Sequence, residues 1–236
     1  MTLTLTDIPS IMRYHGWYNG ARLMDIWFAR PSAIAPAYGP ADTTTITMDG
    51  WVLTFDEARE VYNDIVREAI WTNPPAQREI GRMLGRKGLL QAGGSSFGDL
   101  TAAVEALDED YINQRRVEAS VIDDLTDISA ALGNFNIRVV VAGSVQPAPE
   151  GGWTISLEQV GAYVADSYDF EGDQFLGYWD ADDNTVSALN PIAGSAVTNA
   201  DFRQWRSNTG NGGDFRVFSD VKLIPLVTPY VFYFTP

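Results

Sequence analysis

Apolar side chains recur with the period of an α-helix along the first half of the chain. One stripe with the spacing i, i+4, i+7, i+11 predicts a helix buried on most sides: Trp17, Ala21, Met24 and Phe28, widened by Leu23 and Trp27. A capping box at Thr54–Glu57 predicts the start of another helix. Helical spacing also predicts helices over 78–87, ending at Gly88, and over 117–132, ending at Gly133. Between them, the glycine-rich residues 91–99 predict a flexible connection.

After Gly133 the apolar positions alternate, as they do in a β-strand. Residues 136–145 and 153–165 predict two strands, and the second changes phase at Glu158-Gln159, as a β-bulge would cause. A single helix is expected among the later strands, with Thr198 or Asn199 as its N-cap, Asp201 in its first turn, and Phe202 and Trp205 facing inward. Alternation predicts three further strands, over 174–179, 214–226 and 230–234.

This order of elements predicts an α+β fold. A helical N-terminal lobe, residues 1–133, is expected to pack on a β-rich C-terminal lobe, residues 134–236, built as an antiparallel sheet or partial barrel with one inserted helix. The chain has 236 residues, of which 45% are hydrophobic, and that is enough to form a core of this kind.

Composition limits the chemistry that the chain can perform. There is no Cys, which excludes disulfides and thiolate catalysis, and His15 is the single His, which excludes sites with several His ligands. Because His15 lies far along the chain from the other polar clusters, a partly buried structural role is expected for it. The net charge of −15 argues against binding nucleic acid. We find no signal peptide and no transmembrane segment, so we expect the chain to be made in the cytoplasm.

The acidic residues are concentrated in one region. Residues 139–202 contain no Lys or Arg but ten Asp and Glu residues: Glu150, Glu158, Asp166, Asp169, Glu171, Asp173, Asp180, Asp182, Asp183 and Asp201. One interpretation is a solvated acidic face. The other is a cleft in which carboxylates converge with arginines or with a divalent cation, because clustered carboxylates repel one another unless a cation relieves them.

The densest group of polar residues is Asp166-Ser167-Tyr168-Asp169, at the end of a predicted strand. Carboxylates beside a Tyr hydroxyl can hold Mg²⁺ or activate a water, so Asp166, Tyr168 and Asp169 are candidate catalytic residues. A turn over 169–173 would complete a metal site of Asp166, Asp169 and Asp173, with Mg²⁺ expected before Ca²⁺. The alternative is a structural Tyr followed by turn-forming Asp residues. Asp180, Asp182 and Asn184 match the start of an EF-hand loop but predict only an acidic turn, because the loop's Gly and terminal Glu are missing.

Arg203 and Arg206 form the second group. They lie three residues apart on the predicted helix, on neighbouring outward positions, and two guanidiniums together suit a phosphate or pyrophosphate. The alternative is an internal network of ion pairs with the acidic strand ends. The glycine-rich residues 210–213 follow the helix, so they predict a helix stop and not a phosphate-binding loop.

Several of these segments resemble a proteobacterial domain family of unknown function whose genes often lie near type VI secretion components. The resemblance rests on Asp7-Ile8-Pro9, Gly16-Trp17, Ala21-Arg22-Leu23-Met24, Trp27-Phe28, Asp166-Ser167-Tyr168-Asp169-Phe170, Gln174, Leu176-Gly177, Trp179, Asn199, Asp201-Phe202-Arg203, Trp205-Arg206, Gly212-Gly213-Asp214-Phe215 and Val217-Phe218-Ser219-Asp220-Val221. It implies a secretion context.

A shorter resemblance concerns the motif Asp166-x-Tyr168-Asp169, which is similar to the Asp-x-Tyr-Asp core of the colicin M family. Those bacteriocins hydrolyse the pyrophosphate-linked cell-wall precursor lipid II with Mg²⁺. In that family a His-Arg pair follows the motif, whereas Phe175-Leu176 occupy about that position here.

Two functions from different classes follow. The first is an antibacterial effector, delivered to the periplasm of a target cell, that hydrolyses a phosphate ester or pyrophosphate of a cell-wall lipid. Arg203 and Arg206 would then neutralise the developing phosphate charge. The second is a non-catalytic interaction protein, an immunity protein or adaptor, whose partner is a cognate protein or secretion component. A sugar-binding or Ca²⁺-binding β module is a third possibility.

Overall fold

The computed structural model describes residues 3–33, 39–119, 125–191 and 194–236. Its helices are α1 (Ile8–Tyr14), α2 (Tyr18–Ala29), α3 (Asp56–Arg67), α4 (Pro74–Arg86), α5 (Val104–Leu107), α6 (Asp127–Ala131) and α7 (Asn199–Thr209). Its strands are β1 (Ser95–Phe97), β2 (Asn113–Val117), β3 (Phe135–Pro147), β4 (Trp153–Tyr168), β5 (Phe175–Asp180), β6 (Thr185–Ser187), β7 (Ser195–Thr198), β8 (Phe215–Phe218), β9 (Lys222–Ile224) and β10 (Tyr230–Phe234). Helices dominate the N-terminal part, and the described residues form antiparallel sheets without a closed barrel. The α+β prediction is confirmed.

The chain divides into two compact units, each assembled from three stretches of sequence. Unit 1 comprises residues 1–46, 118–135 and 166–217, and unit 2 comprises residues 47–117, 136–165 and 218–236. Each unit therefore draws on both sides of Gly133, the residue at which the sequence predicts a boundary between lobes.

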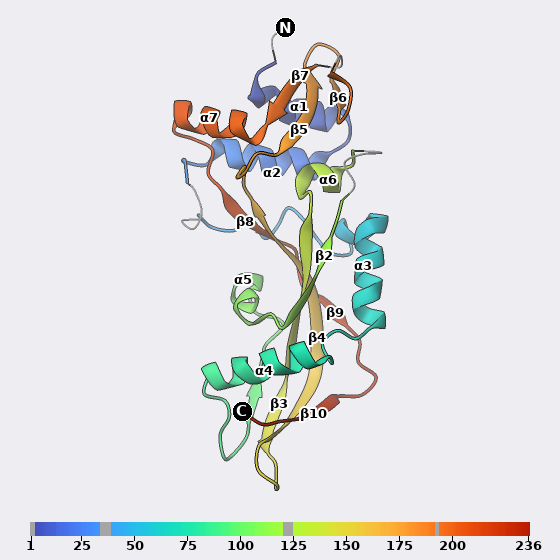
Figure 1. Cartoon of the computed structure of the whole chain (residues 1–236), viewed down its shortest axis with the longest axis vertical. Helices are drawn as coiled ribbons and strands as arrows, with labels where there is room; N and C mark the ends of the chain where they lie inside the picture. The colour runs from blue at the N-terminus through green and yellow to red at the C-terminus, as the bar shows by residue number, and fades with distance from the viewer. Residues whose placement is uncertain (1–2, 34–38, 120–124, 192–193) are drawn as a thin grey trace. The chain divides into compact units, whose positions relative to one another are not determined.

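Unit 1 is a helical layer with a small sheet. Helix α2 packs against α1 and α6, and β5 lies between β6 and β7 in an antiparallel sheet (Figure 1). Helix α2 has its expected buried face, and Trp27 in its last turn is fully buried. The Trp27 ring meets Phe170 edge-on at 4.8 Å and Phe202 at 5.6 Å between centroids. These aromatic contacts join α2 to α7 and to the turn after β4.

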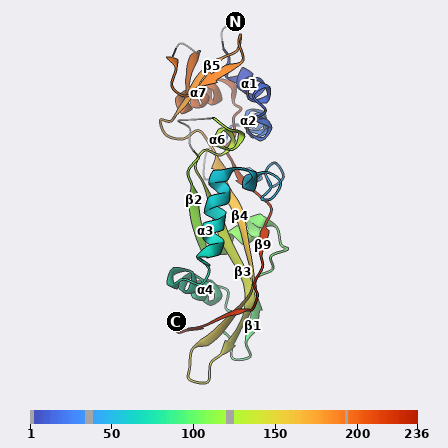
Figure 2. The ribbon, with the colours of Figure 1, turned by 90° about the vertical axis from the view of Figure 1, so that its right-hand side faces the viewer.

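Unit 2 is built on the long antiparallel pair β3–β4 (Figure 1). Helices α3 and α4 lie along the sheet that contains β2, β3 and β4 (Figure 2). The register of β3 and β4 shifts where Ala142 faces Gln159 and Gly143 faces Leu157, so that Glu158 is the extra residue. The β-bulge predicted at Glu158-Gln159 is confirmed.

A partly buried polar network in unit 2 joins the segment after α5 to the sheet. The Tyr163 hydroxyl donates to Asp108 Oδ1 at 2.6 Å, and Arg138 Nη1 donates to the same oxygen at 2.6 Å. Burial raises the pKa of Tyr163, and the hydrogen bond to Asp108 raises it further. Tyr163 is therefore a neutral hydrogen-bond donor inside the core.

Of two N-caps predicted from the sequence, the one at α7 is confirmed and the one at α3 is wrong. Thr198 is the N-cap of α7, and its hydroxyl and backbone N–H both donate to Asp201 Oδ2, so this prediction is confirmed. The capping box at Thr54 is wrong. The Thr54 hydroxyl donates to the carbonyl of Trp51 at 2.6 Å, and α3 begins one residue later than predicted, at Asp56, with Phe55 as its N-cap. The Thr54 hydroxyl is hydrogen-bonded within the 3₁₀ turn Val52–Thr54, so it does not cap α3.

Several element boundaries also differ from the predictions. Helix α4 ends as expected before Gly88, which has φ of 66°, but it begins at Pro74 behind an Asn73 cap. Residues 95–97 form strand β1 inside the expected flexible connection, because they pair with β3. Val117 ends strand β2, so the helix predicted from it is wrong there, and among the described residues of that segment α6, near its end, is the helical part. Val121, also counted in that helix, lies outside the described residues. The strand predicted over 214–226 is two strands, β8 and β9.

Within the described residues, we find no helix that is long and apolar enough to cross a membrane.

Candidate functional site

The predicted catalytic Tyr168 is a core residue of unit 1. Its ring stacks on Phe215, with centroids 5.2 Å apart, and meets Phe170 edge-on at 5.7 Å. Burial raises the pKa of its hydroxyl, which therefore stays protonated. Asp166, two residues earlier on β4, is half-buried. The ring of Tyr168 thus lies within an aromatic cluster.

Asp169 begins the turn that follows β4. The Ser167 hydroxyl donates to Asp169 Oδ2 at 2.6 Å, and the Glu171 backbone N–H donates to Asp169 Oδ1 at 3.2 Å. Both carboxylate oxygens accept hydrogen bonds from neighbouring residues. This is the arrangement by which an Asp stabilises a turn.

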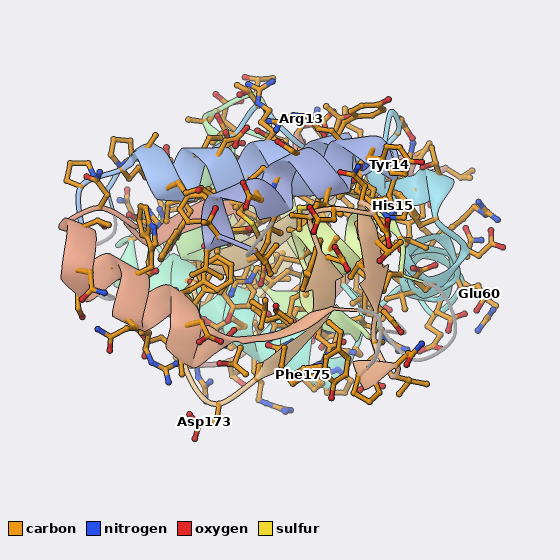
Figure 3. The ribbon with its side chains drawn as sticks, turned by 90° about the horizontal axis from the view of Figure 1, so that it is seen from above. Arg13, Tyr14, His15, Glu60, Asp173 and Phe175 are labelled. Carbon is orange, nitrogen blue, oxygen red and sulfur yellow. The ribbon has the colours of Figure 1, made fainter. Side chains whose placement is uncertain are left out.

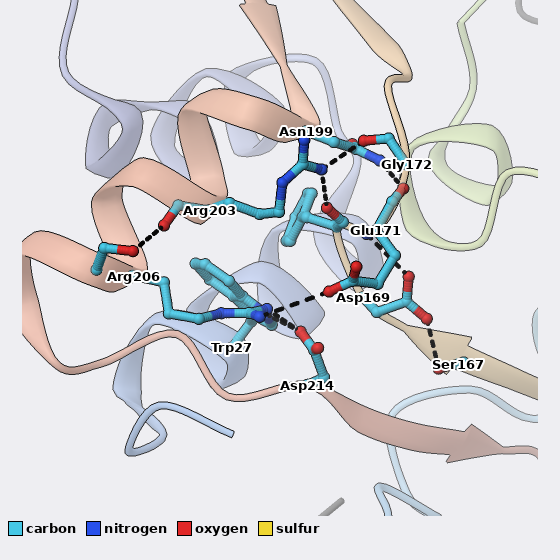
Figure 4. A network of polar contacts seen from close by, with 11 residues as sticks. Trp27, Ser167, Asp169, Glu171, Gly172, Asn199, Arg203, Arg206 and Asp214 are labelled. Atoms are coloured by element: carbon cyan, nitrogen blue, oxygen red, sulfur yellow. Dashed lines mark hydrogen bonds and ion pairs between the residues drawn. The ribbon is translucent and has the colours of Figure 1, made fainter. Parts of the chain in front are cut away.

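Arg203, on α7, holds the same turn from the other side. Its Nη1 donates to the carbonyl oxygens of Phe170, at 2.8 Å, and of Gly172. Its Nη2 lies 3.3 Å from Asp173 Oδ1, although the Asp173 side chain is 98% exposed. The guanidinium therefore serves mainly the main chain of the turn, as Figure 4 shows.

Arg206 is buried, with 4% of its side chain exposed, so the prediction of an outward position is wrong. Its Nη2 pairs with Asp214, whose side chain is fully buried, and its Nη1 lies 3.8 Å from Glu171 Oε1 (Figure 4). The indole N–H of Trp27 donates to the same Asp214 oxygen at 2.9 Å. Burial raises the pKa of Asp214, against the lowering effects of the Trp27 hydrogen bond and of Arg206. The Arg206 side chain therefore points inward, where it pairs with the buried carboxylate of Asp214.

These contacts form one internal network, which we call the turn network: Trp27, Ser167, Asp169, Glu171, Asn199, Arg203, Arg206 and Asp214 (Figure 4). The structure thus brings the predicted acidic turn and the two predicted arginines together. Among the described residues, however, no group of three Asp, Glu or His side chains is placed to hold a metal ion, and Asp166, Asp169 and Asp173 form none. The chemistry that the network supports directly is stabilisation of the turn.

Sequence analysis missed three members of the turn network. In the sequence, Asp214 is the first residue of a predicted strand, and Trp27 is a residue of a predicted buried helix face. Asn199, a candidate cap, instead donates through Nδ2 to the Glu171 carbonyl at 2.6 Å. An Asp placed between a Gly pair and a strand of aromatic residues was the one available sign of a buried acceptor.

A second notable feature of unit 1 is the turn between α1 and α2, which we call the aromatic corner: Tyr14, His15, Gly16, Trp17 and Tyr18. His15 stacks on Trp17 at 5.1 Å, and Trp17 meets the buried Trp179 of β5 edge-on at 6.5 Å. His15 is exposed, so the expected partial burial is wrong, but its role is structural in that Nε2 donates to the carbonyl of Asn184 at 2.9 Å. Tyr14 and Tyr18 are 70% and 67% exposed.

The acidic turn predicted at Asp180–Asn184 joins β5 to β6. Asp180 Oδ1 accepts the backbone N–H of Asp182 at 2.8 Å and of Asp183 at 3.3 Å. Asp182 and Asp183 themselves are exposed. Because His15 binds the carbonyl of Asn184, this acidic turn lies against the aromatic corner.

A groove of 540 Å³ is found in unit 2, between α4 and the segment 109–114. Arg78, Arg82, Tyr111 and Asn113 are among its lining residues. None of the predicted catalytic residues lines it.

The fold and the site define an α+β protein with antiparallel sheets and an internally paired polar network. The chain belongs to a family of unknown function, DUF6402, whose model matches residues 3–196 and 193–234. The predicted membership of a domain family of unknown function is therefore confirmed. No curated protein and no solved structure matches the chain.

Proposed function

We propose that this chain is a non-catalytic interaction protein, an immunity protein or adaptor, that binds a basic protein partner through the aromatic corner and the adjoining acidic turn of unit 1. The carrying observation is that two tyrosines lie largely exposed on a corner that is itself rigidly held by ring contacts and by the His15–Asn184 hydrogen bond. Aromatic side chains on a rigid support lose little entropy on binding and are frequent anchors of interfaces.

Charge gives the class of partner. The exposed carboxylates of Asp182 and Asp183 lie next to the aromatic corner, in a chain with a net charge of −15. An arginine side chain fits both parts of such a surface, because its guanidinium pairs with carboxylates and stacks on tyrosine rings. A partner segment rich in arginine is therefore complementary to this surface.

The turn network favours this proposal over the hydrolase. A phosphoryl group needs guanidiniums that are free to meet it, but Arg206 is buried against Asp214 and Arg203 binds carbonyls of the chain. Tyr168 is buried, with its ring stacked on Phe215. The hydrolase and its Mg²⁺ stay predictions that no specific contact favours.

A binding experiment tests the proposal. The family resemblance to proteins encoded near type VI secretion components makes the products of the flanking genes the first partners to test. Calorimetry of the purified chain with each of these proteins, and with synthetic arginine-rich, lysine-rich and glutamate-rich peptides as probes, measures the preference for a basic partner. We expect binding of the arginine peptide to exceed that of the lysine peptide, and to weaken as salt is added.

The variant Tyr14→Ala/Tyr18→Ala is expected to weaken binding about tenfold or more, since truncating an aromatic anchor of an interface costs about 1–2 kcal/mol. Phe175→Ala is the matched control, because Phe175 is also an exposed aromatic of unit 1 but lies apart from Tyr14 and His15 (Figure 3). Unchanged affinity in the double variant, or equal affinity for the glutamate peptide, would contradict the proposal.

A further inference from the structure

Strand β10 forms an edge of the sheet in unit 2. It pairs with β4 from Tyr230 opposite Leu157 to Phe234 opposite Trp153, and among the described residues β4 is its only strand partner. An edge strand presents a row of backbone N–H and C=O groups that can pair with another strand.

The two faces of β10 differ. Phe232 is buried, Phe234 lies against Gly81 of α4, and the Tyr230 hydroxyl is 2.9 Å from Gln77 Nε2, also on α4. Helix α4 therefore covers one face. On the other face, Val231 and Tyr233 are 55% and 53% exposed, and the Tyr233 hydroxyl donates to the carbonyl of Gly151.

The strand itself contains no residue of the types that usually protect an edge. It contains no Pro and no charged residue, and residues 223–236 have no charged side chain in a chain of −15. All five positions of β10 are aromatic or β-branched, the residue types that favour strand pairing.

We propose that β10 pairs with β10 of a second copy of this chain, in an antiparallel two-fold arrangement centred on Phe232. This register places Val231 opposite Tyr233 of the second copy, and Tyr230 opposite Phe234. Every cross-strand pair is then aromatic with aromatic or aromatic with β-branched, which are the favoured pairs in sheets. The strand is thus complementary to itself, as a symmetric interface requires.

Charge singles out a second copy as the occupant. Two chains of −15 repel each other, and residues 223–236 are a surface segment at which they can meet without facing like charges. A basic partner, by contrast, gains no ion pair at this edge. This inference is independent of the proposed function, which concerns unit 1.

Light scattering coupled to gel filtration tests the pairing. The wild-type chain is expected to be a dimer whose fraction rises with protein concentration and does not fall when salt is added, because salt screens the repulsion. Val231→Lys is expected to give a monomer with an unchanged far-ultraviolet circular dichroism spectrum, since Val231 is exposed. Val66→Lys is the matched control, because it introduces the same charge at another exposed valine of unit 2, on α3, and is expected to leave the dimer intact.

Disulfide trapping tests the register. The chain has no Cys, so any cross-link reports the introduced residues alone. Opposite residues of antiparallel strands have Cα atoms about 4.5–5.5 Å apart, which a disulfide can bridge. A mixture of Val231→Cys and Tyr233→Cys chains is expected to cross-link on oxidation, whereas each variant alone places its two cysteines on diagonal positions beyond reach and is expected not to.

A wild-type chain that stays monomeric at high concentration would overturn the inference, even if a foreign strand bound the same edge. So would a Val231→Lys chain that dimerises as the wild type does. Cross-linking of either single variant as fast as the mixture would overturn the register. Loss of dimerisation with retained binding of the arginine peptide would leave the proposed function standing.

Discussion

At the scale of single residues, burial decides what each polar side chain does. Arg206 and Asp214 lie in a helix and a turn whose sequence allows either an open anion site or a closed ion pair. The structure buries both partners, and Arg206 Nε and Nη1 and Asp214 Oδ2 have no hydrogen-bond partner among the described residues. If one partner of such a buried pair is removed, the charge of the other stays buried without compensation, and the fold is destabilised.

Removing one partner is therefore expected to be costly. Asp214→Ala leaves the Arg206 charge buried and the Trp27 indole N–H without its acceptor, so we expect a loss of about 3–5 kcal/mol in the free energy of unfolding. Urea denaturation monitored by tryptophan fluorescence measures this loss. Arg82→Ala, which removes an exposed ion pair with Glu79, is the control and is expected to cost less than about 1 kcal/mol.

The double replacement separates the pair from its surroundings. Arg206→Met/Asp214→Leu removes both charges, and we expect it to cost less than Asp214→Ala alone because no buried charge remains. If Asp214→Ala cost no more than Arg82→Ala, the turn network would not be a stabilising element, and the arginines would again be available as a candidate anion site.

At the scale of elements, strand pairing and close packing set positions that single residues must fit. The β-bulge in the β3–β4 pair brings Gly143 so near β4 that a Cβ there would overlap the carbonyl oxygen of Ser156. Gly85, near the end of α4, has no atom within 4 Å of the position of a Cβ. The packing around Gly143 therefore leaves no room for a side chain, whereas the surroundings of Gly85 leave room for one.

Alanine substitution is expected to have opposite effects at these two glycines. Gly143→Ala forces β4 to move and should lower the free energy of unfolding by about 1–3 kcal/mol. Gly85→Ala should raise it by about 0.5–1 kcal/mol, because alanine restricts the unfolded chain and favours helix. Thermal and urea denaturation of the two variants measure both changes. Equal effects of the two substitutions would show that the bulge does not set this close approach.

Sequence patterns predicted several features whose causes are local. The capping residue of α7 and the bulge at Glu158 follow from neighbouring residues, and both are confirmed. Strand β1 lies in a glycine-rich stretch with no strand pattern of its own and exists because β3 pairs with it. Val117 fitted a helical spacing but belongs to β2, because pairing with β3 outweighs periodicity.

At the scale of the whole molecule, stability against alkaline pH depends on buried tyrosines. Burial raises the pKa of Tyr163 and of Tyr168 well above the value of about 10 that they have when unfolded. Both states hold the proton at neutral pH, so the stability is unaffected there. Above about pH 10 only the unfolded chain releases the proton, and the free energy of unfolding falls as pH rises.

We expect this decline to be about 1.4 kcal/mol per pH unit for each buried tyrosine. Tyr163→Phe loses the hydrogen bond to Asp108 and should be less stable at pH 8, but its decline above pH 10 should be shallower than that of the wild type. Urea denaturation at a series of pH values gives the slopes, and identical slopes for wild type and Tyr163→Phe would contradict the assignment.

The candidate site could be predicted only as a set of segments. Sequence alone brought Asp169–Asp173, Arg203 and Arg206 to attention, and the structure places these segments in one network. The sequence alone did not predict the polar contacts of Asp214 and Trp27, because these contacts depend on packing between α2, α7 and the residues before β8. Which carboxylate receives which guanidinium is set by contacts among residues far apart in sequence.

The sequence by itself determined the classes of element, the α+β fold, the absence of thiol chemistry and the strong negative charge. Those properties follow from local periodicity and composition, and no tertiary contact alters them. Tertiary structure alone decided that Arg206 turns inward, that Tyr14 and Tyr18 remain on the surface, and that β10 is an edge. Burial and strand pairing arise between distant segments, and the energy of a charge or an aromatic ring depends on which of those segments surrounds it.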